Sequence, residues 1–228
     1  MTASTTTYAL LGMLASRPWT GYELTQQVRR SLRFVWPTSE GHLYREQRRL
    51  VELGWATVEV EAAGGRSRKR YAITATGRGA LQEWLATGPD EPHLQVEGVL
   101  RAFYGDSGTV QDLSRSLVAT VEAARRMQDE LVGYVREYLA AEGPLALLES
   151  GDGGPDARRA VHGRPVFPER LPAVALAVDA TTRLLTALQD FGVEAVEELR
   201  DWPSTTDPEL AVLTRARLEA IIARSEGR

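Results

Sequence analysis

The stretch that most constrains the fold is residues 37–74, in which a helical segment leads directly into two strand segments joined by glycines. Ser39 is a favourable N-cap for a helix that ends near Leu53. Gly54 then suits the left-handed position that follows many helix C-termini. A helix that passes so quickly into a β-hairpin leaves few compact arrangements for the surrounding chain.

Two alternating segments predict the hairpin itself. Residues 55–61 are rich in valine and alternate in polarity, as expected of a half-buried strand, and residues 68–74 predict the returning strand. Between them, residues 62–67 contain two adjacent glycines and predict the turn.

Two further helices are predicted before this stretch. Threonines 5–7 can cap a first helix, which Pro18 ends. Thr20 is the expected N-cap of a second helix that runs to about Leu32, and Glu23 stands three residues later, where a capping box requires it.

A fourth helix is predicted from Thr74 or Thr76 through Leu85. The order is therefore three helices, two strands and a helix, which predicts an N-terminal winged helix-turn-helix over 1–87. A linker over 88–93 and a helical C-terminal domain over 94–228 complete the expected organisation. The fold class is mainly α with a small β-hairpin wing.

The helix over residues 39–53 is expected to have one apolar and one cationic face. At 100° per residue, leucines and Gln47 fall on one arc and three arginines fall on the opposite arc. The arginines are Arg45, Arg48 and Arg49. This division is typical of a helix that enters a DNA groove, and the alternative is an ordinary solvated helix surface.

The hairpin carries a second cluster of cations within five residues, namely Arg66, Arg68, Lys69 and Arg70. A cationic hairpin tip can contact phosphates and release their counterions. The alternative is a charged edge strand that resists pairing with other strands. The absence of an anion from the tip favours the phosphate contact.

Charge is divided unevenly along the chain, although the net charge is only −4. Residues 1–87 contain 12 Lys and Arg against 7 Asp and Glu, whereas residues 88–228 contain 15 against 24. This split is expected when only the first domain meets a polyanion. Because the chain has no cysteine, disulfides, thiolate metal sites and cysteine nucleophiles are excluded.

The C-terminal part is expected to consist of a short helix over 94–104, two long helices over 110–141 and after Pro172, and a last helix over 209–225. The glycine- and proline-rich segment 143–168 predicts a flexible loop, and Gly192 could bend the second long helix. The long helices carry apolar seams that we expect to form an antiparallel dimerisation domain, with an intramolecular bundle as the alternative. The candidate dimerisation residues are Leu113, Leu117, Val121, Leu131, Val178, Leu185 and Leu188.

A family resemblance rests on two motifs. One is Ser39-x-Gly41-x-Leu43-Tyr44, continued by Leu50 and Gly54, and the other is Arg70-Tyr71-x-Ile73-Thr74-x-x-Gly77. Residues 5–87 resemble the PadR family of transcriptional regulators, although that family usually has leucine where Gln47 stands. The resemblance implies a homodimeric winged-helix repressor that a small molecule often releases.

Candidate DNA contacts come from three places. We expect Arg45 and Arg49 to reach bases, because arginine can bind guanine bidentately, and Arg48 and Tyr44 to meet phosphates. The start of the third helix, the start of the second helix and the wing supply further contacts. These further candidates are Ser39, Glu40, His42, Thr20, Gly21, Tyr22, Arg66, Arg68, Lys69 and Arg70.

No enzyme motif is present, and the three histidines are scattered, so we expect neither catalysis nor a metal or other cofactor. Trp36 and Trp202 are the tryptophans left over for a ligand. The expected partners are double-stranded DNA, a second copy of the chain and a small aromatic or hydrophobic effector. No membrane span and no signal peptide are expected, which points to the cytoplasm. An architectural DNA-binding protein without an effector and a winged-helix protein-interaction module remain alternatives.

Overall fold

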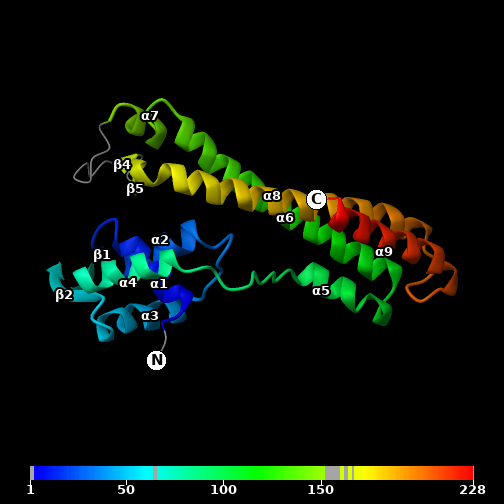
Figure 1. Cartoon of the computed structure of the whole chain (residues 1–228), viewed down its shortest axis with the longest axis horizontal. Helices are drawn as coiled ribbons and strands as arrows, with labels where there is room; N and C mark the ends of the chain where they lie inside the picture. The colour runs from blue at the N-terminus through cyan, green and yellow to red at the C-terminus, as the bar shows by residue number, and fades with distance from the viewer. Residues whose placement is uncertain (1–2, 64–65, 152–159, 162–163, 166, 228) are drawn as a thin grey trace. The chain divides into compact units, whose positions relative to one another are not determined.

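The computed structural model describes residues 3–63, 66–151, 160–161, 164–165 and 167–227 (Figure 1). The chain forms two compact units. The first combines Met1–Pro92 with Ala141–Leu171, and the second combines His93–Ala140 with Pro172–Arg228.

The N-terminal part of the first unit confirms the predicted order of elements. Its helices are α1 (Thr5–Leu14), α2 (Gly21–Ser31), α3 (Glu40–Glu52) and α4 (Ala75–Ala86). Its antiparallel sheet has the order β1-β3-β2, with β1 at Trp19–Thr20, β2 at Ala56–Ala63 and β3 at Arg66–Ile73. Strand β1 was not predicted, because a two-residue strand has no sequence period. The turn predicted over 62–67 is shorter than expected, since pairing continues to Ala63 opposite Arg66.

Local capping signals account for most of these helix boundaries. Thr20 and Glu23 form the predicted capping box of α2, and Ser39 caps α3 by accepting a hydrogen bond from the His42 backbone N–H. Gly54 has a φ of 69°, the left-handed conformation that glycine adopts at little cost. Helix α1 is a correction, because Ser4 is its N-cap and threonines 5–7 are its first helical residues.

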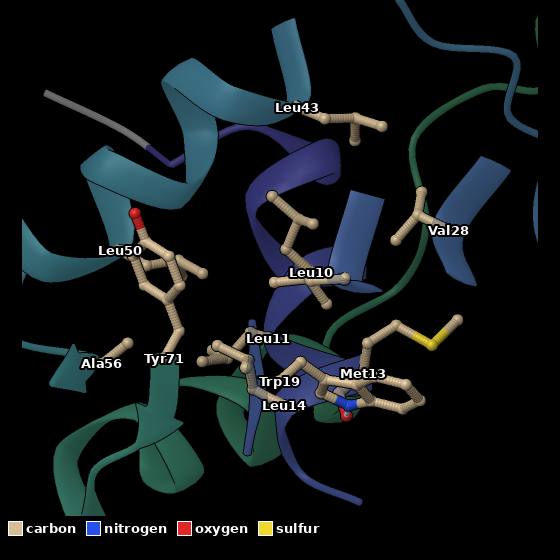
Figure 2. Packing of buried hydrophobic residues seen from close by; sticks show 11 residues of the cluster. Leu10, Leu11, Met13, Leu14, Trp19, Val28, Leu43, Leu50, Ala56 and Tyr71 are labelled. Atoms are coloured by element: carbon tan, nitrogen blue, oxygen red, sulfur yellow. Dashed lines mark hydrogen bonds between the residues drawn. The ribbon is translucent and has the colours of Figure 1, made fainter. Parts of the chain in front are cut away.

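The core of this unit gathers around α1 (Figure 2). Leu10 and Leu11 of α1 are fully buried, and so are Leu24 of α2 and Leu43 and Leu50 of α3. Burying one such side chain contributes about 1.5–3 kcal/mol. This shared core fixes α3 by its apolar side and leaves its other side to the solvent.

The segment 141–171 differs from what the sequence predicted. Within it the structure contains α7 (Pro144–Glu149), β4 (Ala160–Val161) paired with β5 (Arg164–Pro165), and the short helix η2 (Pro168–Arg170). Part of the expected loop is therefore helical, and the remaining positions 152–159, 162–163 and 166 lie outside the described residues.

This segment also belongs to a different unit from the one expected. Phe167 packs against Trp19 of β1, with ring centroids 6.0 Å apart, and joins the core of the first unit. The boundary of the C-terminal domain at 94–228 therefore needs correction, because 141–171 clusters with the N-terminal elements.

The second unit is helical. It contains α5 (Glu97–Phe103), η1 (Gly105–Ser107), α6 (Val110–Leu139), most of α8 (Leu171–Glu198), η3 (Leu199–Asp201), η4 (Pro208–Leu210) and α9 (Ala211–Glu226). Helix α8 runs beside α6 in the opposite direction (Figure 1). Gly192 does not interrupt α8. It is buried against α6, since a Cβ there would lie 2.4 Å from Cγ2 of Val121.

The seam residues proposed for dimerisation are largely used within one chain. Four of them are buried, and Leu113, Val178 and Leu188 are half-buried. The buried ones are Leu117, Val121, Leu131 and Leu185. For these four the structure agrees with the alternative of an intramolecular bundle, because α6 and α8 cover each other's apolar stripes.

Among the described residues, one helical stretch, Pro168–Asp201, is long and apolar enough to cross a membrane by length and composition alone. Within it, Asp179 and Arg183 form an ion pair of 3.0 Å, Leu185 is buried, and Gly192 lies against Val121 of α6. A bundle helix has the same composition, so the absence of a membrane partner stays a prediction.

Candidate nucleic-acid interface

Helix α3 has the two faces that the sequence predicted. Leu43, Gln47 and Leu50 are fully buried against the core. On the other side Tyr44, Arg45 and Arg48 are exposed, whereas Arg49 is half-buried and forms an ion pair of 3.2 Å with Glu52. The exposed face therefore offers two arginines and a tyrosine hydroxyl to a ligand of opposite charge.

Gln47 fixes α3 against the start of α2. Its Nε2 donates to the Gly21 carbonyl oxygen at 3.0 Å and to the Thr25 hydroxyl at 2.9 Å. Its Oε1 is buried, with no hydrogen-bond partner among the described residues. A polar residue thus stands where an apolar one would fill the core, and it holds two helices at one angle through hydrogen bonds.

The N-terminus of α3 is fastened by ion pairs. Glu40 pairs with Arg29 of α2, and the two side chains are equally exposed at 49%. His42 Nδ1 lies 3.1 Å from Nη2 of Arg45, which positions that guanidinium. The ion pair of Glu40 with Arg29 joins α2 to α3, and the DNA contact predicted for Glu40 stays a prediction.

Glu46 makes a further link that sequence reasoning missed. Its carboxylate accepts hydrogen bonds from the hydroxyls of Ser4, at 3.0 Å, and Thr7 at the start of α1. Thr7 is fully buried although it is polar. No local signal marks this contact, because the residues are about 40 positions apart and meet only in the fold.

The start of α2 exposes one of its three predicted contact residues. Thr20 and Gly21 are buried, and the Thr20 hydroxyl is held by Glu23 at 2.8 Å. Thr20 and Gly21 therefore present no exposed side chain and their predicted DNA contact stays a prediction, whereas the side chain of Tyr22 is 67% exposed. Burial raises the pKa of Glu23. The hydrogen bonds from Thr20 and the nearby Arg17 outweigh that effect and leave the pKa below its ordinary value.

The wing carries exposed cations, but not without anions. Arg68 and Lys69 are exposed and Arg70 is half-buried, while the side chain of Arg66 lies outside the described part of the chain. In the β2–β3 register Glu59 stands opposite Arg70 and Glu61 opposite Arg68. The tip itself contains no anion, but strand pairing places two glutamates of β2 at register positions opposite two of its arginines.

The described residues contain no group of three histidine, aspartate or glutamate side chains that could hold a metal ion. Three helices, a wing and an exposed cationic helix face define a winged helix-turn-helix protein with a helical second unit.

Comparisons with known proteins agree with this class. Residues 10–83 match the model of the "Transcriptional regulator PadR-like family". The "Negative transcriptional regulator PadR" of Bacillus subtilis is 23% identical over 141 residues, which cover 61% of this chain and 78% of that protein. The winged-helix part of this chain is therefore similar to the PadR-like family of transcriptional regulators.

Solved structures show the same fold. Bacillus subtilis PadR in complex with operator DNA has a TM-score of 0.63 at 17% identity, covering 85% of this chain and 98% of that chain. The same protein in complex with p-coumaric acid has a TM-score of 0.58 at 18% identity, covering 85% and 98%. At these identities the likeness concerns the fold.

Proposed function

We propose that this chain is a transcriptional regulator of the PadR-like kind, and that it is a repressor that binds operator DNA as a homodimer and is released by a small molecule. The observation that carries the proposal is the exposed face of α3, where Tyr44, Arg45 and Arg48 stand on a helix whose opposite face is locked into the core. A relative described as a negative regulator and related folds in complex with operator DNA and p-coumaric acid support it.

Arg45 is the leading candidate for base recognition. It is exposed on the outer face of α3, and His42 holds its guanidinium. A guanidinium held in place loses less rotamer freedom when it binds guanine bidentately. Tyr44, Arg48, Tyr22 and the wing then serve as phosphate contacts, which position the protein without reading sequence.

A homodimer would cover the apolar surface that the second unit leaves open. Scattered apolar residues are normal on a monomer, but a large continuous patch usually marks an interface. The second unit exposes large apolar side chains on three helices. They include Val99, Leu100 and Phe103 on α5, Leu176, Leu184 and Val193 on α8, and Val212, Leu218 and Ile222 on α9.

The test of base recognition is a binding titration on the chain's own promoter region, followed by Arg45→Ala. We expect a loss of about 1–3 kcal/mol in affinity for the operator, with relaxed preference at one base pair. Arg126→Ala is a matched control, because Arg126 is an exposed arginine of α6 in the second unit. Equal losses on operator and random DNA would contradict base recognition by Arg45.

The oligomeric state is tested by size-exclusion chromatography with light scattering. The chain has a mass of 25.1 kDa, and the proposal expects twice that mass in solution. A monomer at micromolar concentration would refute the homodimer. Binding to DNA that no small molecule weakens would favour an architectural protein, and absence of DNA binding would favour a protein-interaction module. The expected location is the cytoplasm, where operator DNA is accessible.

A further inference from the structure

Gln47 is a polar side chain on an otherwise apolar buried face. The buried residues of α3 are Leu43, Gln47 and Leu50, and Gln47 has no exposed surface. The two leucines lie one turn away on either side of it and belong to the cluster around α1 (Figure 2). A buried amide loses its hydration, so the fold must provide hydrogen bonds in return.

The fold provides only part of these hydrogen bonds. Nε2 of Gln47 donates to the Gly21 carbonyl oxygen at 3.0 Å and to the Thr25 hydroxyl at 2.9 Å. Because a carbonyl oxygen can only accept, these contacts also fix which way the amide faces. Oε1 then lies against Gly21, where a Cβ would be 2.8 Å from it, and it has no donor among the described residues. An apolar side chain of similar volume would leave no polar atom unpaired, so stability alone does not account for glutamine at this position.

The hydrogen bonds of Gln47 join the two places that carry proposed DNA contacts. Gly21 directly precedes Tyr22, whose side chain is 67% exposed, and Gln47 directly precedes Arg48, which is also exposed. The bond from Nε2 to the Gly21 carbonyl oxygen therefore ties the backbone beside one contact to the helix turn that carries the other. A change in the angle between α2 and α3 would alter the spacing of Tyr22 from Arg48.

A second connection holds the other end of this helix pair. Arg29, near the end of α2, forms an ion pair with Glu40, the first residue of α3, and both side chains are 49% exposed. Exposed ion pairs contribute little and are screened by salt. Burial of leucines is non-directional, whereas hydrogen bonds constrain both distance and angle. The bonds of Gln47 are thus a directional constraint at the end of the pair that carries Tyr22.

We propose that Gln47 is a positioning residue for operator recognition. It sets the angle of α3 on α2, and with it the spacing of the Tyr22 and Arg48 contacts, at a cost in stability. The inference rests on the proposed function, because it assigns to this side chain the geometry with which operator DNA is read. Removal of the amide should therefore leave the fold as stable or more stable and make recognition poorer, which a purely structural residue would not do.

Gln47→Met separates these two effects. Methionine is unbranched like glutamine and adapts to the space that the amide leaves. No donor is left unpaired, because the Thr25 hydroxyl itself donates to the Gly21 carbonyl oxygen at 2.9 Å. We expect the midpoint of urea unfolding to be unchanged or higher. Gln82→Met makes the same exchange at an exposed position of α4, and this control should change neither stability nor DNA binding.

Titrations with operator and random duplexes provide the functional measurement. A changed helix angle moves Arg45 relative to the contacts of α2, and base contacts tolerate such a shift less well than phosphate contacts. We expect Gln47→Met to weaken operator binding by about tenfold, the size of one weakened base contact, and binding to random DNA by much less. An unchanged ratio of the two affinities would overturn the proposal. A loss of operator binding that only follows a lower urea midpoint, or failure of both Gln47→Met and Gln47→Leu to fold, would overturn it as well.

The helix angle can also be measured without DNA. The chain has no cysteine, so spin labels attached at Gln26→Cys of α2 and Glu52→Cys of α3, both exposed positions, report a single distance. Labelled protein is diluted with unlabelled protein so that only pairs within one chain contribute. We expect double electron–electron resonance to give a narrow distance distribution, and a shifted or broader one when Gln47→Met is added.

The two measurements separate failure of this inference from failure of the proposed function. An unchanged distance distribution in Gln47→Met would overturn the positioning role whether or not the protein binds an operator. Failure of the unsubstituted protein to bind operator DNA would instead overturn the proposed function, and the distance measurement would still decide whether Gln47 sets the angle between α2 and α3.

Discussion

A single methyl group at position 192 tests how closely α6 and α8 pack. A Cβ there would lie 2.4 Å from Cγ2 of Val121, whereas its next neighbours are 3.8 Å and 3.9 Å away. Alanine gains about 1 kcal/mol over glycine inside a helix, but overpacking a core costs about 1–3 kcal/mol. We therefore expect Gly192→Ala to lower the free energy of unfolding by about 1 kcal/mol.

Gly133 provides the matched control within α6. No heavy atom lies within 4 Å of a Cβ built there, so Gly133→Ala has only the helical gain. This variant should raise the free energy of unfolding by about 1 kcal/mol. The two substitutions are chemically identical, and the expected difference of about 2 kcal/mol between them measures the contact with Val121 alone.

A double-mutant cycle tests the partner directly. Val121→Ala removes the clashing methyl group and costs about 1.6 kcal/mol in lost burial, counted as two methylene equivalents. With the smaller residue in place, Gly192→Ala should become neutral or stabilising, which gives a favourable coupling energy of about 1–2 kcal/mol.

The assay is urea unfolding followed by circular dichroism. Measurements at several protein concentrations are needed, because a dimer gains stability as its concentration rises. If Gly192→Ala stabilised the protein as much as Gly133→Ala does, or if no coupling to Val121 were found, the close packing of α6 on α8 would be refuted.

Two further predictions concern the first unit. Gly77→Ala should lower the free energy of unfolding by about 3 kcal/mol or more, because the new Cβ would lie 2.2 Å from the Trp55 carbonyl oxygen. Gly79→Ala should stabilise the fold, because no heavy atom lies within 4 Å of a Cβ built there. Thermal unfolding measures both effects. The pKa of Glu23 in the folded protein lies below its ordinary value of 4.5. The charged carboxylate therefore stabilises the fold above pH 4.5, and this stabilisation is lost as the pH falls through the lower folded-state pKa. Glu23→Gln should therefore destabilise the fold at pH 7 and have little effect in acid below the folded-state pKa, and an equal effect under both conditions in urea unfolding would contradict this reasoning.

The elements of the winged helix could be predicted because their signals are local. The capping box of Thr20 and Glu23 and the N-cap at Ser39 each act within one helical turn, and Gly54 marks the end of α3 by its own conformation. The two faces of α3 follow from the helical period. Each of these features depends on residues that are neighbours in sequence, so it could be predicted without knowing the tertiary contacts.

Sequence reasoning missed contacts whose two partners are distant in sequence. One of them is the ion pair between Glu40 of α3 and Arg29 of α2. Phe167 looked like part of a loop until it packed on Trp19, which is about 150 positions away. Neither contact has a periodic signal, because its two partners meet only in the fold.

The wing shows how register changes a functional prediction. Side chains alternate along a strand, so Lys69 lies on the same face as Tyr71, which is buried in the core beside α3. Burial raises the pKa of Tyr71, and the nearby charge of Arg48 partly offsets that rise. Arg48 of α3 therefore lies near the face of β3 that carries Tyr71 and Lys69.

Arg68 lies on the opposite face of the hairpin, and Glu61 stands opposite it in the register. If the side shared with α3 meets the duplex, Lys69→Ala should flatten the dependence of log affinity on log salt by about one unit. Arg68→Ala should flatten it less, because strand alternation places Arg68 on the face away from Tyr71 and α3. A larger change for Arg68→Ala would show instead that the outer face of the wing contacts the phosphates.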